Sequence, residues 1–102
     1  MAAVPSRIMP IEENVKNVDV NDPKVKAVAE FALSKYPEEK LILHRVEAGQ
    51  TVQAFRPEWN FYYNLIISAR RCHEPLLVFC SAIVKLRVSD QSYHPISFVR
   101  LP

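Results

Sequence analysis

The sequence predicts an α+β domain in which one long helix is wrapped by an antiparallel sheet of four strands, with a five-stranded sheet as the alternative. Three observations support this prediction. Apolar residues follow helical spacing only between residues 21 and 36, and from residue 41 onward they tend to recur at every second position. Pro37 separates the two patterns. Because the strands follow one another directly, we expect an antiparallel meander packed on the helix.

The predicted helix has a clear start and a clear end. Asn21-Asp22-Pro23 supplies a side-chain acceptor for the first amides and places proline where its missing N–H costs nothing. Pro37 ends the segment, because the residue before a proline disfavours helical geometry. We therefore predict one helix over residues 22–36. Its buried stripe is expected to contain Val25, Val28, Ala29, Ala32 and Tyr36, widened by Phe31 and Leu33.

The strands are predicted mainly from alternation. A short apolar segment spans residues 41–46, and a last strand is expected over residues 96–101, after Pro95. Between them, two strands joined by a polar connection at residues 70–75 each have one drier face. The first face has Phe61, Tyr63, Leu65, Ile67 and Ala69, and the second has Leu76, Val78, Cys80, Ala82, Val84 and Leu86. The predicted shared core is Val28, Ala32, Leu65, Ile67 and Val84.

Residues 1–20 are interpreted as a flexible N-terminal arm, because they show no sustained period. Residues 21–102 are interpreted as a single domain, since a chain of 102 residues has room for one core. Residues 1–9 do not resemble a secretory signal. We therefore expect a cytoplasmic protein, or a secreted one from which a leader has been removed.

Composition and charge argue against several functions. The formal net charge is +2 and the basic residues are scattered, so we expect no nucleic-acid partner. The longest uncharged apolar-rich stretch, residues 59–69, is too short for a bilayer span, so we expect no membrane partner. A single glycine in the chain argues against a glycine-rich phosphate loop.

No catalytic or metal-binding constellation is expected, and hence no cofactor and no enzymatic activity. Cys72-His73 is the one pair that suggests a nucleophile with its base, but adjacent side chains usually point apart and no second cysteine pair accompanies them. Cys72 and Cys80 are the only cysteines. They are predicted to remain thiols, because the first lies in the connection and the second several residues into the return strand.

Short motifs along the chain resemble those of plant cystatins. The most specific is Val28-Ala29-Glu30-Phe31-Ala32-Leu33, which is similar to the family's signature helix. The other matches are Pro10-Ile11, Asn21-Asp22-Pro23, Val46-Glu47-Ala48-Gly49, Tyr63-Asn64-Leu65-Ile66-Ile67, Ala82-Ile83-Val84 and Phe98. The resemblance spans residues 8–101 and implies the cystatin-like fold, one helix wrapped by an antiparallel sheet.

The resemblance also implies a binding edge. Cystatins inhibit papain-like cysteine proteinases with a wedge made of a glycine-containing trunk, a first hairpin loop Q-x-V-x-G and a second loop with P-W. Transferred to this chain, the wedge comprises the arm, a first loop over residues 50–59 and a second loop over residues 89–94. The implied proteinase-binding residues are Ile8, Met9, Pro10, Gln50, Val52, Gln53, Ala54, Phe55, Arg56, Trp59, Tyr93 and His94.

The sequence departs from the family pattern at all three contact elements. Ser6-Arg7-Ile8 stands where the trunk glycines belong, and the second loop over residues 87–95 lacks P-W. The first loop reads Val52-Gln53-Ala54-Phe55-Arg56 in one register. In the other register it reads Gln50-Thr51-Val52-Gln53-Ala54, and neither ends in glycine. The scaffold motifs are therefore kept while the usual contact residues are changed.

The aromatic residues in these loops have two interpretations. Phe55 and Trp59 serve as anchors for a partner, or Trp59 folds back as a lid on the core. Tyr93 and His94 replace the missing tryptophan, or they form a turn before Pro95. His44 is expected to be packed or half-exposed in the first strand.

Three functions remain open from the sequence. The leading hypothesis is a reversible, tight-binding inhibitor of papain-like cysteine proteinases. The alternative is inhibition of pepsin-like aspartic proteinases, as in the squash-type inhibitors, which resemble cystatins but lack the papain-binding motifs. The third is a non-inhibitory interaction module. The expected partner is thus a target proteinase, and the expected state is a monomer, with a domain-swapped dimer as the alternative.

Overall fold

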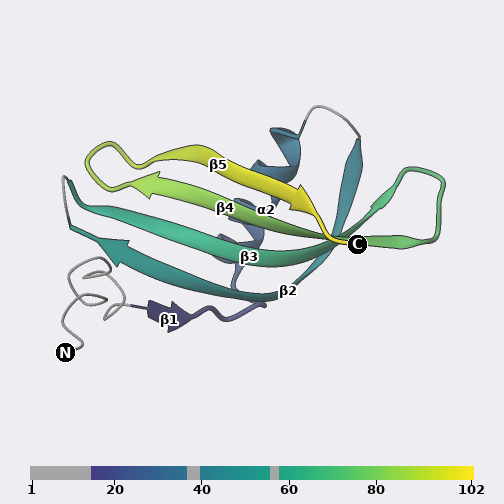
Figure 1. Ribbon diagram of the computed structural model, residues 1–102, viewed down its shortest axis with the longest axis horizontal. Helices are drawn as coiled ribbons and strands as arrows, with labels where there is room; N and C mark the ends of the chain where they lie inside the picture. The colour runs from purple at the N-terminus through teal and green to yellow at the C-terminus, as the bar shows by residue number, and fades with distance from the viewer. Residues whose placement is uncertain (1–14, 37–39, 56–57) are drawn as a thin grey trace.

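The computed structural model describes residues 15–36, 40–55 and 58–102. In these ranges, one helix packs against a single five-stranded sheet in the order β1-β2-β3-β4-β5, and every neighbouring pair of strands is antiparallel. Figure 1 shows the helix lying across one face of the long, curved sheet. The elements are β1 (Val15–Asn17), α2 (Pro23–Ser34), β2 (Leu41–Ala54), β3 (Asn60–Arg71), β4 (Leu77–Arg87) and β5 (Ser92–Arg100).

Helix α2 begins where the sequence predicts. The Asp22 carboxylate accepts a hydrogen bond from the Lys24 amide at 2.9 Å, and Pro23 occupies the first turn. The helix ends at Ser34, two residues before the predicted end, because Lys35 leaves helical geometry as the C-cap. Its buried face consists of Val25, Val28, Ala29, Ala32 and Leu33.

The inner face of the sheet packs on this helix as predicted. Leu65 and Ile67 from β3 and Val84 from β4 have no or almost no exposed surface, and they join Val28 and Ala32 in one core cluster. The predicted phase of both strands is therefore confirmed. The prediction for Leu76 is wrong: it precedes β4 and is 77% exposed, because the hairpin extends past the area that the helix covers.

Strand β2 runs eight residues beyond its predicted end at Val46 and reaches Ala54. Gly49 interrupts the apolar pattern but lies within the strand. A glycine is needed at this position because the neighbouring atoms leave no room for a side chain. A Cβ atom there would lie 2.5 Å from Leu65 and 3.1 Å from the Asn64 carbonyl oxygen. The strand also contains two bulges, at His44 and at Glu47, which increase its twist. The bulged His44 is exposed, whereas the sequence led us to expect a packed or half-exposed side chain.

Strand β5 begins at Ser92, four residues before its predicted start at residue 96. The sequence prediction treated Pro95 as a boundary, but β5 is an edge strand and tolerates proline there. The register passes from Ser97 opposite Ile83 to Pro95 opposite Val84, which makes Ile96 the additional residue of a bulge. The longer strand leaves only residues 88–91 for the turn.

Strand β1 lies within the region predicted as an irregular arm. Val15, Lys16 and Asn17 pair with Val52, Thr51 and Gln50, which gives the five-stranded alternative. The arm residues Ile8, Met9 and Pro10 lie outside the described residues. Within the described ranges, no helix has the length and apolar character of a membrane span.

The two cysteines lie where the sequence placed them. Cys72 is exposed just beyond the end of β3, and Cys80 is buried in β4 opposite Ile67. No disulfide joins them. The register explains this, because five residues along β3 separate Ile67 from Cys72.

Candidate binding edge

Two strand connections lie together at one end of the sheet. Figure 1 shows the β2–β3 and β4–β5 connections at the left and the β3–β4 hairpin at the right. A backbone hydrogen bond from the Val88 amide to the Trp59 carbonyl, 3.2 Å long, joins the first two connections directly. The predicted arrangement of the loops at one end is therefore confirmed. We call the segments 55, 58–61 and 87–92 the binding edge.

Phe55 and Trp59 form an exposed aromatic pair on this edge. Their ring centroids are 6.0 Å apart in a stacked arrangement, and the ring centroids of Trp59 and Phe61 are also 6.0 Å apart, in a tilted arrangement. Phe55 is 52% exposed and Trp59 is 47% exposed. Trp59 therefore does not form a lid over the core. Two large, mutually supported rings exposed at a loop are typical of a binding hot spot.

Most of the first-loop residues predicted as contacts lie in a strand instead. Gln50, Val52, Gln53 and Ala54 are part of β2 and pair with β3, so their placement in the loop is wrong. Ala54 is buried, and Gln50 donates to the Asn17 side-chain oxygen at 3.4 Å across the β1–β2 pair. Of the first-loop residues predicted as contacts, Phe55 and Trp59 lie outside the strands, and Arg56 falls outside the described residues.

Tyr93 and His94 also lie in a strand and not in a loop. Both belong to β5 and pair with Leu86 and Lys85, so the predicted second loop over residues 89–94 shortens to the turn at 88–91. The Tyr93 ring packs 5.6 Å from Phe31 of α2. Its aromatic surface therefore contributes to packing between the sheet and the helix.

The turn at residues 88–91 is fixed by side chains at its ends. The Asp90 carboxylate accepts from the Ser92 amide at 3.1 Å and from the Ser92 hydroxyl at 2.5 Å. The same hydroxyl lies 2.7 Å from Nε2 of His94, which donates to it when that nitrogen carries the proton. The hydrogen bond from the Ser92 hydroxyl, supported by its amide and by the positive charge of Arg87, lowers the pKa of Asp90. Asp90 is therefore a charged anchor for the turn.

Arg87 is the residue of this edge that sequence reasoning missed. Its Nη1 donates to the Asp90 Oδ2 at 3.4 Å, and its Nε lies 3.5 Å from the Glu58 Oε2. The Nε atom is buried and forms no hydrogen bond, so the contact with Glu58 is an ion pair without hydrogen-bond geometry. The Arg87 to Asp90 spacing was a weak signal for the first contact, but nothing local in the sequence indicated Glu58.

The described residues provide no metal centre. No group of three or more His, Cys, Asp or Glu side chains within them has the geometry to hold a metal ion. Cys72 and His73 are both exposed in the β3–β4 hairpin, remote from the binding edge. The edge offers exposed aromatic surface and charged side chains.

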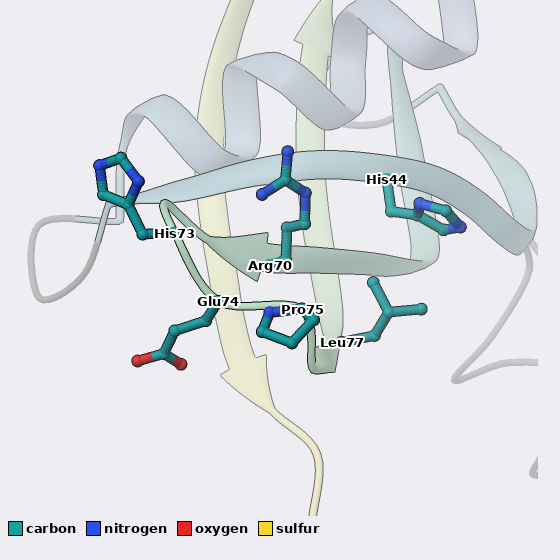
Figure 2. Close-up of a pocket in the computed structure, with 6 residues that line it drawn as sticks. All are labelled: His44, Arg70, His73, Glu74, Pro75 and Leu77. Atoms are coloured by element: carbon teal, nitrogen blue, oxygen red, sulfur yellow. The ribbon is translucent and has the colours of Figure 1, made fainter.

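A shallow hollow of about 550 Å³ lies at the opposite end of the sheet. Figure 2 shows the Arg70 side chain between the rings of His73 and His44, while the Glu74 carboxylate points away from it. Pro75 and Leu77 complete the lining. None of these residues was predicted as a contact, and the hollow serves below as the reference end of the molecule.

Comparison with known proteins gives one informative likeness. No family model matches the chain, and no curated protein does. Among solved structures, the chain is similar to the solution structure of the squash aspartic acid proteinase inhibitor, with 42% sequence identity and a TM-score of 0.68. The match covers 83% of this chain and 88% of that one. The architecture of one helix on a five-stranded antiparallel sheet is thus a cystatin-like fold.

Proposed function

This chain belongs to the family of the squash aspartic acid proteinase inhibitor, and on that premise we propose that it inhibits pepsin-like aspartic proteinases. The observation that carries the proposal is 42% identity over 88% of the inhibitor's chain. Likeness over nearly the whole chain extends beyond a shared fold, which by itself would carry no function.

The geometry of the binding edge supports an inhibitor. Phe55 and Trp59 are exposed on a hairpin whose strands are long and paired up to its last residues, Ala54 and Asn60. Burying the exposed half of one such ring removes roughly 100 Å² from water, worth about 2.5 kcal/mol before the costs of association. Strands paired up to Ala54 and Asn60 limit the conformational entropy lost on binding, so part of this gain is retained.

Inhibition by this edge needs no chemical step. The exposed rings and the turn at residues 88–91 occupy a cleft and exclude substrate from it, while the paired strands behind them hold the shape. Proteinase binding by Ile8, Met9, Pro10 and Arg56, which lie outside the described residues, stays a prediction.

Papain-like cysteine proteinases are the second candidate target, because the fold is cystatin-like. The contact elements argue against them. The glycine of Q-x-V-x-G is replaced by Arg56 in one register and by Ala54 in the other, and the second connection is a short turn without tryptophan. A non-inhibitory module is the third candidate, and the exposed aromatic pair argues against it.

Parallel titrations of pepsin and papain test the proposal. Each enzyme is held at nanomolar concentration with a fluorogenic substrate, and the chain is added in steps. We expect stoichiometric loss of pepsin activity and papain inhibition weaker by at least about a hundredfold, or 2.7 kcal/mol. The reverse order of potencies would identify the cysteine class as the target. No inhibition of either enzyme would contradict an inhibitor of these classes.

A further inference from the structure

We propose that Arg87 is a positioning residue that holds the two connections of the binding edge as one preformed surface, including in the acid where pepsin-like enzymes work. The effect of this positioning on inhibition rests on the proposed function, but the positioning itself is testable in the free protein. Arg87 is the last residue of β4, and its side chain contacts Glu58 in one connection and Asp90 in the other.

The register places Arg87 between the two connections. It pairs with Asn60 at the start of β3 on one side and with Ser92 at the start of β5 on the other. Its guanidinium therefore reaches Glu58 before β3 and Asp90 before β5, at 3.5 Å and 3.4 Å. The next residue, Val88, donates its amide to the Trp59 carbonyl. One side chain and one backbone bond thus link the aromatic pair to the turn.

The shape of the arginine head explains why arginine suits this position. A planar guanidinium presents donors in two directions at once, whereas a lysine ammonium is a single point charge. The Arg87 side chain is 35% exposed, so each ion pair contributes little to global stability. We expect Arg87 to act on how well ordered the two connections are. The two weak contacts of one planar guanidinium fix the position of one connection relative to the other.

Acid acts on the contact between Arg87 and Asp90. The groups facing Arg87 are Glu58 from the first connection and Asp90 from the turn, with His94 of β5 near Asp90. The Ser92 hydroxyl lowers the pKa of Asp90, so its contact with Arg87 persists below the usual titration range of a carboxyl. That contact is lost only as pH falls through the lowered pKa.

This range matters for the proposed target. The catalytic dyad of pepsin-like enzymes is a pair of carboxyl groups that repel each other's charge and share a proton, so these enzymes work in acid, where ordinary carboxyls are partly protonated. A turn anchored by an unassisted carboxylate would loosen there. With the Ser92 hydroxyl bonded to Asp90, Arg87 keeps its contact with the turn and the edge remains assembled.

The single tryptophan, Trp59, reports on the edge directly. Arg87→Met removes the charge at similar length, Arg87→Lys keeps the charge without the planar head, and Arg70→Met is the matched control at the other end. We expect acrylamide quenching of Trp59 at pH 7 and pH 4 to rise about twofold in Arg87→Met, to rise less in Arg87→Lys, and to stay unchanged in Arg70→Met. The inhibition constant for pepsin should rise about tenfold in Arg87→Met alone.

Unchanged quenching in Arg87→Met would overturn the proposal, since the connections would then hold without it. If Arg87→Met is unfolded by circular dichroism, Asp90→Ala removes the carboxylate that Arg87 contacts without altering β4, and unchanged Trp59 quenching in that variant overturns the proposal equally. Wild-type protein that inhibits no proteinase refutes the proposed function, while the quenching result still decides whether Arg87 positions the edge.

Discussion

The two ends of the sheet both expose apolar side chains, but they hold them differently. At the binding edge, the stacked rings of Phe55 and Trp59 lie on a connection that is tied to the neighbouring turn. At the other end, Leu76 is the more exposed residue, in a hairpin stabilised by the local Arg71–Glu74 ion pair of 3.3 Å. Exposure alone would select the wrong end. The combination of exposed rings with restraint is the reason why we propose the first end, and not the β3–β4 hairpin, as the recognition surface.

The largest expected effect acts on both ends together. Leu65 is fully buried in β3, midway between the ends, and contacts both layers of the core. Leu65→Ala should lower the free energy of unfolding by about 2–5 kcal/mol, through lost burial and a residual cavity. Urea unfolding monitored by circular dichroism and by Trp59 fluorescence should show the same shifted midpoint with both probes. A loss below about half a kcal/mol would mean that Leu65 does not belong to the core.

The second effect separates the ends. Replacing Phe55 or Trp59 with alanine should weaken proteinase inhibition at least tenfold, about 1.4 kcal/mol, because each exposed ring is an anchor. The melting temperature should stay nearly constant. Arg70→Met, in the hollow of Figure 2, should leave inhibition unchanged. The assignment of binding to this end is wrong if the Phe55 and Trp59 variants lose stability and keep their affinity, or if Arg70→Met weakens inhibition.

The sequence predicted the faces of the central strands but not the bounds of β2 and β5. Alternation predicted the inner faces of β3 and β4, because side chains on a half-buried strand must repeat every second residue. The bounds of β2 and β5 were missed because Gly49 and Pro95 are residues typical of turns. Gly49 is instead required by its close neighbours in β3 and in the segment before α2, and Pro95 is tolerated on an open edge. Both reasons depend on contacts distant in sequence.

The same limitation applies to the site. The sequence indicated Phe55 and Trp59, since large aromatic residues in a polar loop are unusual, but it also placed Tyr93 there. Tyr93 packs against Phe31, a contact between residues that are far apart in the chain. The role of Arg87 depends on the register between β3, β4 and β5, which no local motif encodes.

A smaller effect concerns the anchor of the turn. Ser92→Ala removes the hydroxyl hydrogen bond that holds the pKa of Asp90 low, so that pKa should rise toward its ordinary value. A depressed pKa contributes stability above the unfolded carboxyl pKa, and this contribution is lost as pH falls through the folded value. The variant should therefore lose its turn at a higher pH than wild type. Carboxyl-carbon NMR titration of Asp90 measures both values, and identical titrations would show that Ser92 is not the cause.

The smallest effect is kinetic and reports on the reference end. Cys72 is exposed in the β3–β4 hairpin, whereas Cys80 is buried in β4. A thiol reagent should label Cys72 rapidly and Cys80 only after unfolding, because burial limits access of the reagent to the thiolate. Mass spectrometry of the labelled peptides separates the two sites. Equal labelling rates would show that β4 opens from the hairpin end in the native protein.

The claim that one end of the sheet binds the proteinase is tested most directly by mapping the contact. Amide signals of the ¹⁵N-labelled chain are followed as unlabelled pepsin is added at about pH 4, where the enzyme is active. The account predicts that the signals of residues 55, 58–61 and 87–92 broaden or shift, while those of residues 72–77 keep their positions and widths. Changes confined to residues 72–77, with the aromatic pair unaffected, would contradict it.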